Sequence, residues 1–307
     1  MEKPPYSKSP YADAALTLGE LINQGQRKIE AVSSSARLDC EILLRHVLGI
    51  SRSALLASLR DPCEDLEAKR YLDLVERRAL GEPVAYITGE REFWGLSFKV
   101  TPDVLIPRPE TEELVARALA LLGSRQRVKI LDLGTGSGCI SIALVSELRL
   151  RMGNSLGSGC SLRCDAVDIS PAALNVARQN AALHGVSGEI RFVESDWFSN
   201  LEQFDPPYDC IIANPPYIDP KESLPIDLKY EPSSALFSKD YGLRDTAEIL
   251  RGGVALLAAD GFLLCEVGAG KQALLPKLLE PYRSRGFACN VLGDASNLDH
   301  FAFIELL

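Results

Sequence analysis

The chain has 307 residues, with 33 lysines and arginines against 42 aspartates and glutamates, which gives a formal net charge of −9. This acidic balance disfavours a dedicated DNA- or RNA-binding protein, which usually carries a basic face. The composition is that of a soluble globular protein, and no run of residues approaches the roughly 18–20 apolar residues of a membrane span.

Eight cysteines are scattered along the chain without a C-x-x-C pair. This pattern predicts neither a disulfide framework nor a zinc site, and we expect no bound metal. Cys160 and Cys164 are four residues apart, which alone is a weak indication of metal binding. Free thiols are typical of a reducing cytosol, and residues 1–10 lack the apolar core of a signal peptide. We therefore expect a cytoplasmic protein that is not associated with a membrane.

The first part of the chain has a helical pattern. Apolar residues recur at spacings of three and four over about 15–24, 33–49 and 64–81. Ser33 or Ser35 is a suitable N-cap for the second helix, and Gly49 can end it. The sequence therefore predicts a small helical domain over residues 1–85.

The pattern changes between about residues 86 and 107. Aromatic and β-branched residues there surround Gly95 and Pro102, which is typical of a β-hairpin. We expect a hairpin linker over residues 86–110, followed by a third region over 111–307.

From residue 107 onwards, helical and strand patterns alternate. Helices are expected over 107–122, 138–148, 172–185, 246–258 and 271–286, and strands over 127–134, 164–170, 189–196, 208–216 and 261–268. This alternation predicts an α/β fold with a mostly parallel sheet and helices on both faces. The Gly/Ser-rich segment 151–163 is expected to be a flexible surface loop.

A glycine-rich turn follows the first predicted strand in ILDLGTGSGCI, with Gly134, Gly136 and Gly138 at alternate positions. Such glycines allow a tight turn and a close approach of a ligand to the main chain. A simple glycine turn is the alternative. The pattern D-x-G-x-G-x-G, which begins at Asp132, differs from the G-x-G-x-x-G of dinucleotide binders. It favours a ligand without phosphate, such as S-adenosylmethionine, over NAD.

Acidic residues end the next two predicted strands. Asp168 can accept hydrogen bonds from both ribose hydroxyls of a nucleoside. Asp168 or Ser170 can also cap the helix that begins at Pro171, and the two roles are compatible. Asp196 and Trp197 follow the third strand and can bond and stack on an adenine ring. A buried core position for Trp197 is the alternative.

The fourth predicted strand ends in Asn214-Pro215-Pro216-Tyr217. The two prolines have fixed φ and no N–H, and each residue before a proline is pushed towards extended geometry. The result is a rigid corner that offers two acceptors, the Asn214 side-chain oxygen and the Pro215 carbonyl. Tyr217 adds a flat face on which a planar group can stack. The motif therefore predicts a clamp for an amide or aromatic NH2 group.

Fixed acceptors suit this chemistry because a planar NH2 nitrogen is a poor nucleophile. Hydrogen bonds from both N–H groups stabilise the positive charge that develops on nitrogen during methyl transfer, and the clamp holds the nitrogen close to the methyl donor. The proton can leave afterwards, so a general base is optional. His46, His184 and His300 all lie outside these motifs.

D-x-G-x-G-x-G together with N-P-P-Y resembles the class I S-adenosylmethionine-dependent amino-methyltransferases, which include protein-glutamine and DNA-adenine enzymes. Three further blocks are more specific: EPVAYITGEREFWGLSFKVTPDVLIPRPETEELV, YEPSSALFS and LLCEVGAGKQ. They resemble the protein-(glutamine-N5) methyltransferases that modify peptide-chain release factors, the PrmC/HemK family. The resemblance extends from about residue 82 to 275, and the N-terminal helical region fits more loosely.

This resemblance implies a class I (Rossmann-like) methyltransferase domain over residues 111–307 and an N-terminal domain that docks the release factor. The methyl group would pass from S-adenosyl-L-methionine, leaving S-adenosyl-L-homocysteine, to the side-chain amide of the glutamine in the factor's G-G-Q loop. We expect a monomer without direct nucleic-acid binding.

The resemblance also assigns roles to individual residues. Cofactor binding is implied for Gly134, Thr135, Gly136, Ser137, Gly138, Asp168, Trp197 and Asn214. Substrate binding is implied for Asn214, Pro215, Pro216 and Tyr217, with catalysis assigned to Asn214, Pro215 and Tyr217. Arg108, Glu110 and Thr111 match a block near the methionine end of the cofactor.

The chain departs from the family pattern in two places. The acidic–glycine pair after YEPxxAL reads Asp240-Tyr241-Gly242, with a tyrosine interposed, and the C-terminal segment NLDHFAFIEL has His300 where the family tends to have an arginine.

Two other functions compete with the glutamine methyltransferase. A DNA adenine N6-methyltransferase would need a basic target-recognition region and a means of base flipping. A non-catalytic scaffold would bind cofactor and dock on a translation factor, but a degenerate N-P-P-Y would be its expected mark.

Overall fold

The computed structural model describes residues 16–153, 160–268, 270–271, 273–293 and 302–307. The chain divides into two compact units, residues 1–88 and 89–307. Three features noted in the sequence lie outside the described residues: the first ten residues, residues 154–159 of the Gly/Ser-rich segment, and His300. No helix within the described ranges is long and apolar enough to cross a membrane.

The first unit is helical. Its helices are α1 (Leu18–Ile29), α2 (Ala36–Leu48), α3 (Arg52–Ala57), α4 (Asp65–Ala79) and α5 (Val84–Thr88). The three helices predicted from periodicity are confirmed as α1, α2 and α4. The prediction missed α3 and α5, because six and five residues are too few for an apolar period to emerge. Gly49 ends α2 in the left-handed conformation, as predicted.

A buried ion pair joins α2 to α4. The Nε of Arg78 donates to Oδ2 of Asp39 at 2.8 Å, and both residues are buried. The hydroxyls of Ser33 and Ser35 also donate to the Asp39 carboxylate. Ser35 occupies the N-cap position of α2, but its side chain makes no capping hydrogen bond. These two serines therefore hold Asp39 rather than cap the helix.

The second unit begins with a β-hairpin, which confirms the prediction. Strands β1 (Glu90–Phe93) and β2 (Leu96–Lys99) pair antiparallel. Trp94 and Gly95 form the turn, and both have positive φ. The following residues, 103–107, were expected to contribute to the hairpin but form no strand. They lead instead to α6 (Thr111–Leu122).

The remainder alternates strands and helices, and confirms the predicted α/β fold. The strands are β3 (Arg127–Leu133), β4 (Ser161–Asp168), β5 (Ile190–Glu194), β6 (Tyr208–Ala213), β7 (Leu257–Val267), β8 (Cys289–Gly293) and β9 (Ala302–Leu306). The longer helices are α7 (Cys139–Met152), α8 (Pro171–Leu183), α11 (Arg244–Gly253) and α12 (Leu275–Arg283), with the short α9 (Ser233–Leu236) and α10 (Lys239–Gly242) before α11.

Seven strands form one sheet in the order β5-β4-β3-β6-β7-β9-β8. The first five of these are parallel, and β9 runs antiparallel to both of its neighbours. The strand order reverses direction between β3 and β6, and ligands bind at such a point beyond the carboxyl ends of the strands.

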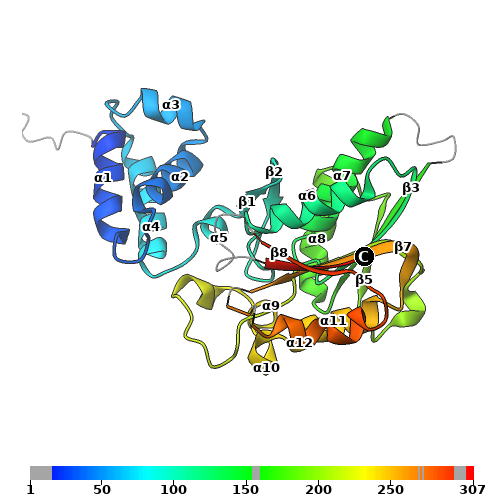
Figure 1. Cartoon of the computed structure of the whole chain (residues 1–307). Helices are drawn as coiled ribbons and strands as arrows, with labels where there is room; N and C mark the ends of the chain where they lie inside the picture. Colours follow the sequence, from blue (N-terminus) through cyan, green and yellow to red (C-terminus); the bar gives the residue numbers. More distant parts are fainter. Residues whose placement is uncertain (1–15, 154–159, 269, 272, 294–301) are drawn as a thin grey trace, which may run out of the picture. The chain divides into compact units, whose positions relative to one another are not determined.

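Helices cover both faces of this sheet (Figure 1). Helices α6, α7 and α8 pack with one set of strand side chains, including Ile130 of β3. Helices α11 and α12 pack with the other set, including Leu131. Successive strand residues point to opposite faces, so the near-continuous apolar run of β3 serves both cores.

Several predicted boundaries were wrong, and the helices expected over 107–122 and 271–286 begin later, at Thr111 and Leu275. The helix expected over 246–258 ends at Gly253, and β7 begins at Leu257 because that residue pairs with Tyr208 of β6. Helix α7 continues to Met152 and β4 begins at Ser161. Both ends of the segment expected to be a loop over 151–163 therefore belong to regular elements.

We expect Asp39→Ala to destabilise the helical unit, because it leaves the Arg78 guanidinium buried without its counter-charge. Removal of one partner of a buried pair costs about 3–5 kcal/mol. Hydrogen exchange of the α2 and α4 amides in the full chain measures this loss. Asp73→Ala, at an exposed position of α4, is the matched control, and equal exchange in the two variants would contradict the prediction.

Candidate active site

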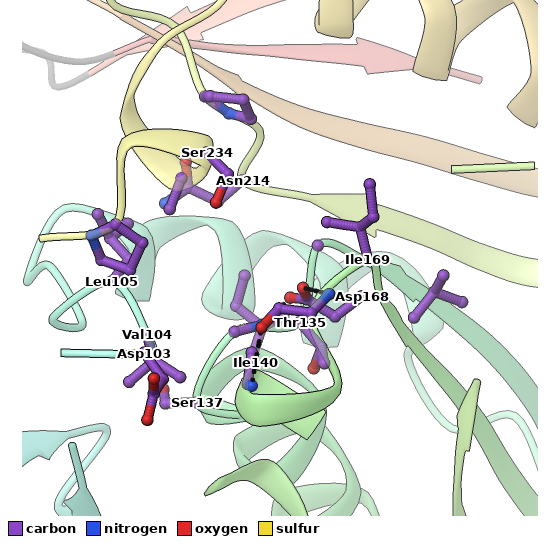
Figure 2. A pocket seen from close by; sticks show the side chains of 18 of the residues that line it. Asp103, Val104, Leu105, Thr135, Ser137, Ile140, Asp168, Ile169, Asn214 and Ser234 are labelled. Carbon is purple, nitrogen blue, oxygen red and sulfur yellow. Dashed lines mark hydrogen bonds between the residues drawn. The ribbon is translucent and has the colours of Figure 1, made fainter. Parts of the chain in front are cut away.

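A pocket opens at the carboxyl ends of β3, β4, β5 and β6, where the strand order reverses. The residues at or after each strand end line it: Gly134, Thr135, Gly136 and Ser137 after β3; Asp168, the last residue of β4, with Ile169 and Ser170; Ser195, Asp196 and Trp197 after β5; Asn214 and Pro216 after β6. Arg108 and Thr111, next to the start of α6, also line it. Figure 2 shows Asn214 and Ser234 across the pocket from Thr135, Ile140 and Asp168.

The glycine loop uses its glycines for two purposes. Gly136 has a φ of +53° and lines the pocket, and a Cβ there would meet nothing within 4 Å. Gly138 does not line the pocket. A Cβ there would lie 2.9 Å from Cδ1 of Ile142 and 3.2 Å from Cβ of Ala177. Gly136 therefore leaves room for a ligand, whereas Gly138 allows α7 and α8 to pack closely.

The buried carboxylate of Asp132 holds this loop through a hydrogen bond. Oδ2 of Asp132 accepts a hydrogen bond from the Thr135 hydroxyl at 2.7 Å, and Oγ of Ser141 lies 3.1 Å from the same hydroxyl. Burial raises the pKa of Asp132 to about 6, and the two hydroxyls oppose the rise. The aspartate identified as the start of the glycine motif thus anchors the loop and does not line the pocket.

Asp168 lines the pocket and is also fixed by two backbone donors. Its Oδ2 accepts from the Gly136 amide and its Oδ1 from the Ser170 amide, both at 2.9 Å. Burial raises its pKa. Ser170 caps α8 by accepting from the Ala173 amide, which confirms that assignment. A carboxylate has about four acceptor positions, so Asp168 retains capacity to bind a ligand hydroxyl.

Trp197 belongs both to the pocket wall and to a core. It has a left-handed φ of +45°, and its Nε1 donates to Oδ1 of Asp245 at 3.0 Å. Its ring lies next to Gly134, where a Cβ would be 3.4 Å from Cζ3. The indole also packs against the core beneath α11 and α12. The two readings of this tryptophan, ligand wall and core residue, are therefore compatible.

Asn214 presents an unpaired oxygen. Its Nδ2 donates to Oγ1 of Thr111 at 3.0 Å, whereas its buried Oδ1 has no hydrogen-bond partner among the described residues. The Thr111 hydroxyl in turn donates to Oε2 of Glu266 at 2.8 Å. A buried acceptor without a partner is unusual in a folded protein, and this one belongs to a side chain that lines the pocket.

The other members of the N-P-P-Y corner are placed differently. Pro216 lines the pocket, whereas Pro215 is buried and Tyr217 half-buried, and neither lines it. Two glycines contact Tyr217. A Cβ on Gly268 would lie 2.5 Å from the ring, and one on Gly242 would lie 2.0 Å from the carbonyl oxygen. Tyr217 can therefore occupy this position only because both neighbours lack a side chain.

A second buried carboxylate, Glu231, braces the pocket rim. Its two oxygens accept from Arg108 Nη2 at 2.6 Å and from the Ile106 amide at 3.0 Å. Glu231 thereby joins the segment before α6 to the segment before α9. Glu110, the third residue noted in the IPRPET block, does not line the pocket.

Sequence reasoning missed the roles of Glu231, Asp245 and Glu266. Glu231 and Glu266 belong to the YEPSSALFS and LLCEVGAGKQ blocks, but neither was singled out. The available signal for Glu266 was a single charge in the apolar strand GFLLCEV, because a buried charge in a strand needs a specific partner. No sequence signal indicated that Asp245 would accept from Trp197.

Two family models match the chain: a PrmC N-terminal domain over residues 20–89 and a methyltransferase domain over residues 124–275. A release factor glutamine methyltransferase of Burkholderia pseudomallei is 42% identical over 82% of this chain and 85% of its own length. The protein of the same name from Nitratidesulfovibrio vulgaris is 36% identical over 96% of this chain and 97% of its own.

Among solved structures, the hMettl16 catalytic domain in complex with a MAT2A 3′UTR hairpin aligns with a TM-score of 0.52. The two chains are 19% identical, and the alignment covers 79% of this chain and 82% of that one. At this identity the likeness concerns the fold alone, and it agrees with a class I methyltransferase sheet.

We expect Thr135→Val to destabilise the second unit by about 1–3 kcal/mol, the cost of leaving a buried acceptor unpaired. Thr135→Ser retains the hydroxyl and is the matched control. The loss has a defined pH dependence. A raised carboxyl pKa means that the contribution of Asp132 to stability falls as pH rises from the ordinary aspartate pKa of 3.8 to about 6.

Loss of the hydroxyl raises that pKa further, so the fall extends to higher pH in the valine variant. Urea unfolding at pH 5 and pH 8 should show a deficit that grows with pH. A deficit of equal size at both pH values, or one shared by the serine variant, would contradict the role of this hydrogen bond.

Proposed function

The chain belongs to the release factor glutamine methyltransferase family, and from this membership we propose that it methylates the side-chain amide (N5) of the glutamine in the G-G-Q loop of peptide-chain release factors. The methyl donor is S-adenosyl-L-methionine and the product S-adenosyl-L-homocysteine. The observation that carries the proposal is the Oδ1 of Asn214. This acceptor belongs to a residue of the pocket wall and has no donor among the described residues.

The pocket residues suit S-adenosylmethionine. Asp168 has free acceptor positions for the ribose hydroxyls, and Gly136 leaves the main chain open to the ligand. The Ser137 hydroxyl is buried in the pocket wall without a partner among the described residues. We assign cofactor binding to the glycine loop, Asp168, Trp197 and Asn214. When bound, the cofactor supplies an electrophilic methyl group on a sulfonium.

The protein's own contribution is to hold and polarise the glutamine amide. Asn214 Oδ1 accepts one N–H of that amide, and we assign the second N–H to the Pro215 carbonyl. These acceptors stabilise the positive charge that develops on nitrogen as it attacks. We place Tyr217 against the flat face of the amide. Pro215 and Tyr217 do not line the described pocket, and their proposed roles follow from the N-P-P-Y motif of the family.

We further propose that the N-terminal helical domain, about residues 1–85, docks the release factor, and that residues 86–110 link it to the methyltransferase domain. The protein would act as a cytoplasmic monomer without direct nucleic-acid binding. All eight cysteines are free thiols, which suits a reducing compartment, and the acidic net charge suits a protein partner better than DNA or RNA.

The direct test is transfer of labelled methyl from S-adenosylmethionine to a purified release factor. A factor with its G-G-Q glutamine changed to alanine and a duplex DNA are assayed in parallel. We expect label on the unmodified factor alone. Label on the DNA would identify an adenine methyltransferase, and label on neither substrate would contradict the proposed activity.

We expect Asn214→Ala to lower kcat by about 10²–10³-fold, the effect of removing one preorganised group that stabilises transition-state charge. Cofactor affinity should change much less, because Asp168 and the glycine loop remain. Single-turnover kinetics and cofactor titration separate the two quantities. Asn200→Ala, outside the pocket lining, is the control, and an unchanged kcat in Asn214→Ala would exclude the clamp.

A further inference from the structure

The clamp requires that the Asn214 amide point its oxygen, and not its nitrogen, towards the substrate. The two ends of an amide are nearly equal in size but opposite in hydrogen-bonding character. An oxygen accepts a hydrogen bond from the substrate N–H, whereas an NH2 group is itself a donor and cannot accept one. The asparagine alone does not decide between these orientations, so a neighbouring group must.

That neighbour is the Thr111 hydroxyl, which has a single proton to donate. The proton goes to Oε2 of Glu266 at 2.8 Å. Towards Asn214 the hydroxyl oxygen can then only accept, and it lies 3.0 Å from Nδ2. The nitrogen is thereby held away from the substrate position and Oδ1 is left as the unpaired acceptor.

We propose that Glu266 is a positioning residue for methyl transfer: through the Thr111 hydroxyl it sets which end of the Asn214 amide faces the substrate. This inference rests on the proposed function. Glu266 does not line the pocket, so it acts only through the two residues that do.

The surroundings of Glu266 leave it without a cationic partner. It is 1% exposed on β7, opposite Phe303 of β9, and no ion pair to it occurs within the described residues. Arg108, whose positive charge lowers the pKa of Glu266, is engaged by Glu231 at 2.6 Å. Tyr217 and Cys265 also face it; burial raises the pKa of both, and the charge of Glu266 adds to the rise. Their pKa values thus stay above neutrality.

Burial raises the pKa of Glu266 itself to about 7. The remaining facing groups act less strongly: Glu110 raises this pKa, and it is lowered by Thr111, Arg108 and Asn214. Glu266 therefore changes its protonation near neutral pH, unlike an ordinary glutamate.

Protonation would reverse the chain of hydrogen bonds. A neutral Glu266 donates its proton to the Thr111 oxygen, and the Thr111 hydroxyl is then free to donate to Asn214. The amide meets that donor by turning its oxygen inward and its NH2 group outward. The outward NH2 cannot accept the substrate N–H, so turnover is lost as one proton binds.

The test is the pH dependence of kcat between pH 5.5 and 9, with cofactor and release factor both saturating. For the unmodified enzyme we expect kcat to fall about tenfold per pH unit below an apparent pKa near 7, as expected for one essential ionisation. Glu266→Gln carries no ionisable group, so its kcat should be lower by about tenfold or more and flat with pH.

Three further variants distinguish a role in orienting the Asn214 amide from a general effect on folding. Thr111→Val removes the hydroxyl that connects Glu266 to Asn214, so its kcat should also be low and independent of pH. Thr111→Ser keeps the hydroxyl, so its kcat should again fall at acid pH. Glu305→Gln replaces another buried glutamate of the same sheet, paired with Arg117 outside the pocket, and should leave the acid limb in place. An acid limb retained in Glu266→Gln would overturn the proposal.

A second readout does not depend on activity. Because the pKa of folded Glu266 is raised, the unfolding free energy of the unmodified protein falls as pH rises from about 4.5 to about 7. Glu266→Gln should lack this fall, so its stability relative to the unmodified protein should rise across that window. The absence of such a difference would refute the claim that Glu266 ionises near neutral pH. Failure of the unmodified enzyme to methylate the factor would instead refute the proposed function.

Discussion

Buried carboxylates at the carboxyl edge of the sheet are the interaction on which the rest of the site depends. Asp132 and Glu266 are buried and Asp168 is half-buried in the pocket wall, and burial raises the pKa of each. None forms an ion pair among the described residues; hydroxyl and amide donors bond to them instead, and Oδ1 of Asp132 has no partner among those residues. Each donor belongs to a segment that lines the pocket. Because a buried carboxylate that loses its donor is costly, these hydrogen bonds hold the lining segments in place.

This arrangement explains how a site built from connecting segments is held rigidly. Asp132 and Asp168 both bind the glycine loop, one through Thr135 and the other through the Gly136 amide. Glu266 binds the N-P-P-Y corner through Thr111. A fixed acceptor stabilises developing charge without reorganising at the moment of reaction, and second contacts of this kind hold an acceptor in position. Burial raises the pKa of these carboxyl groups and the hydrogen bonds oppose that rise.

The sequence predicted the parts of the site that are encoded locally. The glycine loop, Asp168 and Asn214 each follow a recognisable strand, and the carboxyl ends of parallel strands meet at one edge. The contacts that orient these residues could not be predicted in this way. Thr111 and Glu266 are 155 residues apart, and Arg108 and Glu231 are 123 apart. Such pairs depend on the strand order, which periodicity does not specify.

The interposed tyrosine at 241 departs from the family pattern at an exposed position outside the pocket lining. Asp240 and Tyr241 have φ values of +55° and +60°, and left-handed residues of this kind cost about 1–3 kcal/mol each. Tyr241 is 68% exposed, so its side chain occupies no space in the core. Gly242, the next residue, still lies against the Tyr217 carbonyl, where a Cβ would be 2.0 Å from the oxygen. The strain is thus confined to the surface, because only glycine fits behind the corner that presents Asn214.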